Sequence, residues 1–173
     1  MKRICVFFDR DGIVIMSPGP GYVERWQDLH LIPDFVVSAK IAAAKGYAIA
    51  IATNQRGVAR GIVPQETLDD IHKRLTDALS AGGVSLLGIF CCIHERDSCD
   101  CRKPLPGLLL KAAEEHHVDL DASWMIGDRE TDVDTGRAAG CRTILVGQPY
   151  DESNADFRVA DMASLPSMLE RVL

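Results

Sequence analysis

The sequence predicts an α/β fold of the Rossmann-like kind, in which a central parallel sheet lies between two layers of helices (α/β/α). Short apolar runs alternate along the chain with segments of helical periodicity, and this alternation is typical of parallel sheets with both faces covered. The 173 residues are the size of one domain. Because no linker, repeat or low-complexity tract divides the chain, we expect a single domain over residues 1–173.

Five short apolar runs are expected to form the strands. The first, residues 3–8, is a near-continuous run of β-formers that includes Ile4, Val6, Phe7 and Phe8. Runs of this kind are typical of strands that are buried on both faces of a sheet. The other four expected strands are residues 47–52, 86–91, 123–126 and 142–146.

The segments that separate and follow these runs are expected to form helices. Residues 64–81 carry one apolar stripe at helical spacing, with Pro64 in the first turn and two glycines after the last. The stripe comprises Leu68, Ile71, Leu75 and Leu79. The other expected helices are residues 34–45, 106–116, 131–139 and 164–173, the first and third of which are each followed by a glycine.

Composition and charge exclude several classes of protein. Hydrophobic residues make up 47% of the chain and charged residues 25%, which is ordinary for a globular protein and excludes a disordered one. A net charge of −6 makes nucleic acid an unfavourable partner. No apolar stretch approaches the roughly 18 residues of a membrane-spanning helix, and the first residues do not resemble a signal peptide. We expect a cytoplasmic monomer that binds neither membranes nor nucleic acid.

Two aspartates, Asp9 and Asp11, directly follow the first expected strand. Carboxylates that leave a buried strand are costly unless a cation holds them, and a divalent metal ion with oxygen ligands would do so. Like charges this close also raise the pKa of one carboxyl group, which favours one nucleophile and one proton donor. Alternatively, the pair only caps the turn at Gly12.

Other polar residues follow the remaining strands. Thr53 and Asn54 follow the second, Lys103 comes shortly after the third, and Gly127-Asp128 follows the fourth. Because ligands of such sheets bind beyond the carboxyl ends of the strands, we expect these side chains to converge at one edge. Asp128 would then complete the metal site of Asp9. Asp132 could either contact this site or serve as an acidic cap of the following helix.

Four potential zinc ligands lie within ten residues after the third strand. They are Cys92, His94, Cys99 and Cys101, and three thiolates with one imidazole suit a closed tetrahedral Zn²⁺ site that is structural. Cys91 is a possible competitor for a place in this set, and unrelated free thiols are the alternative interpretation. Cys5 and Cys141 lie in or beside expected strands, where we expect them to be buried packing residues.

In order and spacing, these motifs resemble the haloacid dehalogenase (HAD) superfamily of phosphohydrolases across nearly the whole chain. The resemblance implies that Asp9 attacks phosphorus to form an aspartyl-phosphate and that Asp11 is the general acid and base. It implies that Thr53 and Lys103 bind the transferring phosphoryl group. It also implies that Mg²⁺ is bound by Asp9, Asp128 and the backbone carbonyl of Asp11.

Three segments narrow the resemblance to the D-glycero-D-manno-heptose 1,7-bisphosphate phosphatases. They are Gly21-Tyr22-Val23, the loop from Thr53 to Gly61, and the Cys/His cluster followed by Arg102-Lys103-Pro104. The resemblance implies a phosphorylated sugar as substrate, cleaved at its 7-phosphate. It also implies an HAD fold with a zinc loop and no large cap domain. The substrate contacts it implies are Gly21, Tyr22, Asn54, Gln55, Arg56 and Arg102.

Three alternatives remain open at this point. The related histidinol-phosphate phosphatases share the Asp pair and the zinc loop, and a broader phosphosugar phosphatase would share both as well. A zinc-containing binding module is the non-enzymatic alternative. The run Gly12-Ile13-Val14-Ile15 lacks the Asn usual in the heptose family, and this departure concerns the substrate rather than the phosphatase chemistry.

Overall fold

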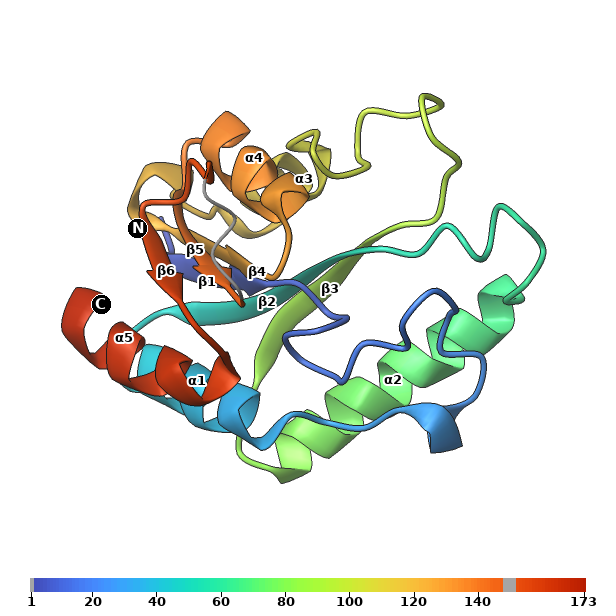
Figure 1. Ribbon diagram of the computed structural model, residues 1–173, viewed down its shortest axis with the longest axis horizontal. Helices are drawn as coiled ribbons and strands as arrows, with labels where there is room; N and C mark the ends of the chain where they lie inside the picture. The colour runs from blue at the N-terminus through green and yellow to red at the C-terminus, as the bar shows by residue number, and fades with distance from the viewer. Residues whose placement is uncertain (1, 148–151) are drawn as a thin grey trace.

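The computed structural model describes residues 2–147 and 152–173, which form one sheet of six parallel strands with helices on both faces (Figure 1). The strand order is β3-β2-β1-β4-β5-β6, so β1 lies inside the sheet. This confirms the expected α/β architecture. The strands are β1 (Cys5–Phe8), β2 (Ala48–Asn54), β3 (Leu86–Cys92), β4 (Trp124–Gly127), β5 (Arg142–Val146) and β6 (Phe157–Val159).

All five expected strands are present, and β6 is the one that the sequence analysis missed. It pairs with β5 at the edge of the sheet through three residues, from Ile144 opposite Phe157 to Val146 opposite Val159. Three residues are too few for a hydrophobic pattern to distinguish a strand from a loop. The first strand is shorter than expected, because Arg3 pairs only with Val118 in an isolated bridge.

All five expected helices are also confirmed, and their ends differ from the expected ones by at most one residue. Such shifts are normal at helix ends. Three short 3₁₀ helices accompany them in the described residues, at Trp26–Asp28, Leu120–Ala122 and Met162–Ser164. The α-helices are α1 (Pro33–Ala44), α2 (Gln65–Ala81), α3 (Gly107–His116), α4 (Glu130–Ala138) and α5 (Leu165–Val172).

The two faces of the sheet are covered by different helices (Figure 1). Val6 and Phe8 of β1 belong to the core shared with α1, α2 and α5, where Phe8 packs edge-on against Phe35 with ring centroids 5.1 Å apart. Cys5 and Phe7 belong to the core shared with α3, and α4 packs on this same side. Successive residues of a strand point to opposite faces, which explains the nearly continuous apolar run of β1.

The expected polar residues gather where β1, β2, β3 and β4 end. The loops after β1, β2 and β3 extend to the same side of the sheet (Figure 1). Both β2 and β3 run further than expected, because Thr53 and Asn54 pair with Cys91 and Cys92. Residues 9–32, between β1 and α1, contain only the 3₁₀ helix Trp26–Asp28. The fold therefore has no large cap over this edge.

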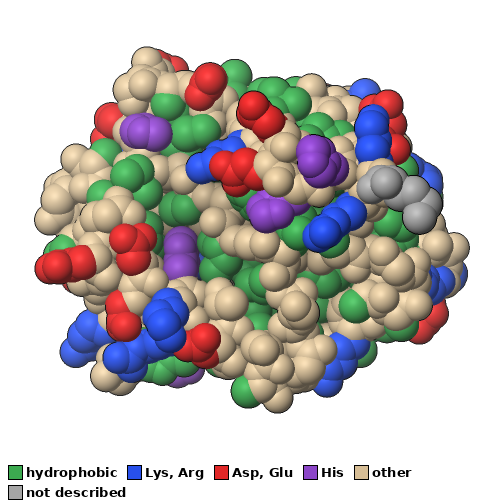
Figure 2. All heavy atoms as spheres, turned by 180° about the vertical axis from the view of Figure 1, so that it is seen from behind, with side chains coloured by type: hydrophobic (Ala, Val, Ile, Leu, Met, Phe, Trp, Pro, Cys, Tyr) green, Lys and Arg blue, Asp and Glu red, His purple; other side chains and the backbone are tan. Residues whose placement is uncertain are grey.

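The surface shows no segregation of charge on the face drawn in Figure 2, where acidic and basic side chains are interspersed. Within residues 2–147 and 152–173, none of the helices has the length and apolar character needed to cross a bilayer. Cys5 and Cys141 are both buried free thiols, as expected of packing residues.

The close packing of α4 on the sheet predicts the effect of a substitution at Gly136. A Cβ at this position would lie 2.6 Å from Thr143 Cγ2 and 2.7 Å from Met125 Cβ. We expect Gly136→Ala to lower the free energy of unfolding by about 1–3 kcal/mol through overpacking, although Ala is the better helix former. Urea denaturation measures this. A stabilised variant would show that α4 can move away from β4 and β5.

Candidate active site

The buried ammonium group of Lys103 is the centre of the polar cluster at the carboxyl edge of the sheet. Its Nζ donates hydrogen bonds to Asp9 Oδ1 (2.7 Å), Asp132 Oδ1 (2.6 Å) and the carbonyl oxygen of Ala52 (2.9 Å). Lys103 is 5% exposed and Asp132 is 1% exposed. Burial acts to lower the pKa of Lys103, but Asp132 and Asp9 outweigh it and raise that pKa. Lys103 is therefore a cation.

Lys103 is held in place through its backbone as well as through its side chain. Asn54, the last residue of β2, donates from Nδ2 to the carbonyl oxygen of Lys103 and accepts from its N–H, both at 3.1 Å. A side-chain amide that pairs with a backbone in this way substitutes for a strand neighbour. The end of β2 thus fixes the segment that follows the Cys/His cluster.

Three carboxylates from neighbouring elements meet beside Lys103. Asp9 directly follows β1, Asp128 directly follows β4, and Asp132 lies in the first turn of α4; one oxygen of each lies within 4.8 Å of the others. The backbone permits this approach because Gly12 and Gly127 have no Cβ, which would otherwise collide with Asp128 and Asp132. The structure thus brings Asp9 and Asp128 together, as expected, and adds Asp132.

The free lone pairs of these carboxylates indicate which of them can bind a metal ion. Both oxygens of Asp132 accept hydrogen bonds, from Lys103 and from the N–H of Arg129. Asp128 Oδ1 is buried and has no hydrogen-bond partner in the described residues. Burial, and then Asp9, raises the pKa of Asp128 to about 6. Arg129 Nε lies 3.9 Å from this oxygen, beyond hydrogen-bond distance. A buried oxygen without a hydrogen bond fits a hard cation such as Mg²⁺.

The two oxygens of Asp9 have different environments. Oδ1 accepts from Lys103 Nζ and also from the N–H of Arg10 at 2.7 Å. Oδ2 accepts no hydrogen bond from the part of the chain that the structure describes. Burial, followed by the charge of Asp132, raises the pKa of Asp9 to about 6. The side chain is thus held by one oxygen and presents the other.

Asp11 points away from the carboxylate cluster. Its oxygens accept from Arg10 Nη2 at 3.1 Å each, and Oδ2 also accepts from Gln55 Nε2 at 2.8 Å. Gln55 additionally donates to Thr53 Oγ1 at 2.9 Å. Gln55 and Thr53 are both buried, so the structure places them behind Asp11. Asp11 and Thr53 share Gln55 as a hydrogen-bond partner, so these side chains converge as expected. The carboxylate of Asp11 is held by Arg10 and is not part of the group formed by Asp9, Asp128 and Asp132.

A cavity of about 900 Å³ lies at this edge of the sheet, and Asp11, Asn54 and Lys103 are among the residues that line it. Its walls come from the loops after β1, β2 and β3 and from the start of α4. Arg102 Nη1 is buried there without a hydrogen-bond partner in the described residues. Of the six expected substrate contacts, all but Gln55 line the cavity: Gly21, Tyr22, Asn54, Arg56 and Arg102.

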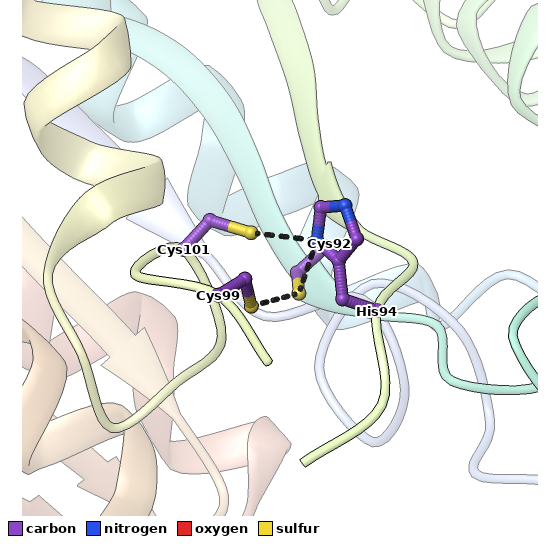
Figure 3. A group of neighbouring side chains, drawn as sticks. All are labelled: Cys92, His94, Cys99 and Cys101. Carbon is purple, nitrogen blue, oxygen red and sulfur yellow. Dashed lines mark hydrogen bonds between the residues drawn. The ribbon is translucent and has the colours of Figure 1, made fainter. Parts of the chain in front are cut away.

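The Cys/His cluster forms a closed group beside this cavity (Figure 3). Cys92 Sγ lies 3.6 Å from Cys99 Sγ and 3.7 Å from His94 Nδ1, and His94 Nδ1 lies 3.2 Å from Cys101 Sγ. A tetrahedral ion with Zn–S bonds of about 2.3 Å requires ligand atoms at about this separation. The arrangement of the four side chains is therefore consistent with a zinc site.

Cys91 does not belong to this group. It precedes Cys92 within β3, and successive strand residues point to opposite faces. Burial raises the pKa of Cys91 to about 12, and Arg10 acts on it in the opposite direction. The side chain therefore lies near Arg10 as a neutral thiol. Cys91 does not compete for a place among the four potential zinc ligands.

Four residues at the site were not predicted from the sequence. Arg96 and Arg129 line the cavity, while Arg10 and His72 of α2 lie behind Asp11, with Arg10 Nη1 3.1 Å from His72 Nε2. Arg129 directly follows Asp128 in the loop after β4, and this position could have indicated that Arg129 lies at the site. A single histidine in an amphipathic helix carries no comparable signal.

Comparison with known proteins agrees with this geometry. The HAD-hydrolase-like family model matches residues 100–161. The D-glycero-β-D-manno-heptose-1,7-bisphosphate 7-phosphatase of Photorhabdus laumondii is 37% identical, over 96% of this chain and 95% of its own. That of Pseudomonas aeruginosa is 32% identical, over 98% of this chain and 99% of its own.

Solved structures give the same result. The D,D-heptose 1,7-bisphosphate phosphatase of B. bronchiseptica, complexed with magnesium and phosphate, is 31% identical, covers 98% of each chain and has a TM-score of 0.81. A HAD-like protein from Mesorhizobium loti has a TM-score of 0.85 at 24% identity, over 98% of this chain and 87% of its own, and supports the fold alone. The chain is thus a phosphoric monoester hydrolase of the HAD superfamily and belongs to the family of the heptose-1,7-bisphosphate 7-phosphatases.

Proposed function

We propose that this protein is a Mg²⁺-dependent phosphatase that removes the 7-phosphate of D-glycero-D-manno-heptose 1,7-bisphosphate through a phosphorylated Asp9. The observation that carries the proposal is the environment of Asp9. Its Oδ1 is held by Lys103 and by the N–H of Arg10, while Oδ2 accepts no hydrogen bond from the described residues. A nucleophile that is oriented in this way presents one defined atom to phosphorus.

The reaction has two steps on the residues of this chain. In the first, Asp9 attacks phosphorus, the bond between phosphorus and the sugar oxygen breaks, and Asp11 gives its proton to that oxygen. In the second, water attacks the aspartyl-phosphate, Asp11 takes the proton of the water, and inorganic phosphate leaves. Asp11 thus alternates between acid and base.

Lys103 and Thr53 would bind the transferring phosphoryl group. All three N–H donors of Lys103 already have acceptors, so a phosphoryl oxygen would replace one of them. The raised pKa of Lys103 keeps its charge available for this. A fixed cation in a buried site stabilises the charge that develops on the phosphoryl oxygens.

Asp9, Asp128 and the backbone carbonyl of Asp11 would hold Mg²⁺. Asp128 Oδ1, which is buried and has no hydrogen-bond partner in the described residues, supports this assignment, as does the magnesium in the B. bronchiseptica relative. The ion would supply charge neutralisation between the carboxylate nucleophile and the phosphate dianion. Asp132 would act on Lys103, because both of its oxygens already accept hydrogen bonds from the protein.

The cavity supports a substrate with a second anionic group. Arg56, Arg96, Arg102 and Arg129 line it, and guanidinium groups match phosphate oxygens well. The heptose specificity of the relatives is consistent with this cationic wall. Phosphate release from heptose 1,7-bisphosphate, with the product identified by NMR and with histidinol phosphate as the comparison substrate, tests the proposal. Faster hydrolysis of histidinol phosphate would contradict it.

We also propose that Cys92, His94, Cys99 and Cys101 bind one structural Zn²⁺. The distances among their ligand atoms support a tetrahedral site. The ion would crosslink the loop whose last cysteine directly precedes Arg102 and Lys103. On the opposite side of this loop, Glu95 accepts from Arg56 and Arg60, so zinc would also steady the wall of the cavity.

Replacing the nucleophile should abolish turnover without unfolding the protein. We expect Asp9→Asn to lower phosphate release by at least about 10³-fold, because an amide does not form an acyl phosphate. Asp134→Asn, at an exposed position on α4, is the matched control and should keep normal activity. Substantial activity of a pure Asp9→Asn variant that mass spectrometry shows to be free of deamidation would refute the mechanism.

Arg102 should distinguish substrate binding from chemistry. We expect Arg102→Ala to cost roughly 2–4 kcal/mol in kcat/KM for the bisphosphate, the range for losing a contact with a charged group. The same variant should lose far less with 4-nitrophenyl phosphate, which has no second anionic group. Lys103→Ala should impair both substrates alike. If Arg102→Ala impairs both equally, Arg102 serves the reacting phosphate instead.

Elemental analysis should find one zinc per chain, and two adjacent cysteines test the site. We expect Cys92→Ser to lose the metal and Cys91→Ser to keep it, because only the first of these thiols faces the cluster. Zinc loss should increase the hydrogen exchange of residues 93–101 before the sheet unfolds, since these residues lie outside the paired strands. Full zinc content in Cys92→Ser would contradict this assignment.

A further inference from the structure

Arg10 is a fully buried charged residue whose side chain has no part in the mechanism described above. It lies between Asp9 and Asp11 in sequence and is 0% exposed. Burying a guanidinium is costly unless its charge is paired and its donors have acceptors. Its acceptors are both oxygens of Asp11 and the imidazole of His72. The side chain therefore connects the proton-transfer residue to α2.

His72 fixes the far end of this guanidinium. Arginine has only donors, so the contact of 3.1 Å between Arg10 Nη1 and His72 Nε2 requires the imidazole nitrogen to accept. His72 then carries its proton on Nδ1. The histidine lies between Ile71 and Leu75 in sequence, and both of these side chains are buried in the core under the sheet. Helix α2 is thus a rigid support for the acceptor.

Asp11 is held from two sides as a result. Arg10 contacts both of its oxygens, with Nη2 at 3.1 Å from each and Nε at 3.3 Å from Oδ1. Gln55 contacts Oδ2 from the end of β2. Hydrogen bonds to charged groups are strong and directional, so these contacts fix the plane of the carboxylate. Asp11 also lines the cavity, where it can meet the leaving oxygen.

We propose that Arg10 and His72 are positioning residues for Asp11, with His72 setting the guanidinium that orients the acid–base carboxylate toward the leaving oxygen. The inference rests on the proposed function, in which Asp11 protonates that oxygen. It assigns a role to α2, none of whose residues lines the cavity within the described part of the chain. Small displacements of a proton-transfer group reduce the rate strongly, so loss of the distant histidine would affect chemistry more than binding.

The experiment compares two substrates of nearly equal shape, phenyl phosphate and 4-nitrophenyl phosphate. Phenolate needs a proton as it leaves much more than 4-nitrophenolate does, so kcat/KM for phenyl phosphate reports the acid step. We expect His72→Leu to lower kcat/KM about ten-fold for phenyl phosphate and less than about three-fold for 4-nitrophenyl phosphate. His72→Gln, which restores an acceptor at similar reach, should recover most of the loss.

Two controls separate this role from a merely structural one. Leu75→Val truncates a buried neighbour on α2 and should lower the melting temperature without changing the ratio between the two substrates. In the Asp11→Asn background, His72→Leu should cause no further loss, because its effect passes through Asp11. Equal losses on both substrates, or a full additional loss in the Asp11→Asn background, would overturn the proposal.

The outcome for Asp11 itself distinguishes this inference from the proposed function. Asp11→Asn should show the same preference for 4-nitrophenyl phosphate, and more strongly than His72→Leu. If Asp11→Asn lacks this preference, the acid–base assignment of Asp11 is wrong and the proposed mechanism fails. If Asp11→Asn has the preference and a well-folded His72→Leu lacks it, only the role of Arg10 and His72 is refuted.

Discussion

The interaction on which the rest of the site depends is the buried contact of Lys103 with Asp9 and Asp132. Three carboxylates whose oxygens lie within 4.8 Å of one another would repel strongly in a buried environment without a cation. Lys103 provides that cation at 2.7 Å from Asp9 and 2.6 Å from Asp132. Burial first, and then a neighbouring aspartate, raises the pKa of Asp9 and of Asp128 to about 6. Because one ammonium group faces three carboxylates, the cluster favours a divalent cation at the free oxygens.

The position of Lys103 is in turn determined by structure on both sides of it. The amide of Asn54 pairs with its backbone, and the Cys/His cluster ends one residue before Arg102. Lys103 and its neighbour Arg102 therefore depend on the end of β2 and on the cluster. In the proposed mechanism, loss of the cluster would therefore disturb catalysis, because a lysine on an unrestrained loop would lose its position between two aspartates.

The sequence predicts that a residue lies at the site when the position of that residue follows directly from the order of the strands. Asp9, Asp128 and the cysteines lie at strand ends or at a ligand spacing, and a parallel sheet brings such positions to one edge; their convergence is therefore predictable. The partners of Arg10 are not, because α2 is separated from β1 by more than fifty residues and its register against the sheet depends on side-chain packing. The sequence did not predict β6 for a related reason, since its three residues pair only with β5 at the edge of the sheet.

The residues proposed for phosphate transfer and those proposed for substrate recognition also differ in how firmly the fold holds them. In the proposed mechanism, chemistry depends on Asp9, Lys103 and Asp132, which are buried and connected through the ammonium group of Lys103. Recognition is proposed to depend on arginines in loops. Arg56 donates to Glu95 of the cluster loop, and Arg102 Nη1 is buried without a hydrogen-bond partner in the described residues. Loops can change length and sequence without disturbing the strand ends. Changes in the cluster loop or at Arg56 would therefore alter which phosphorylated molecule fits, while the proposed transfer of its phosphate stays the same.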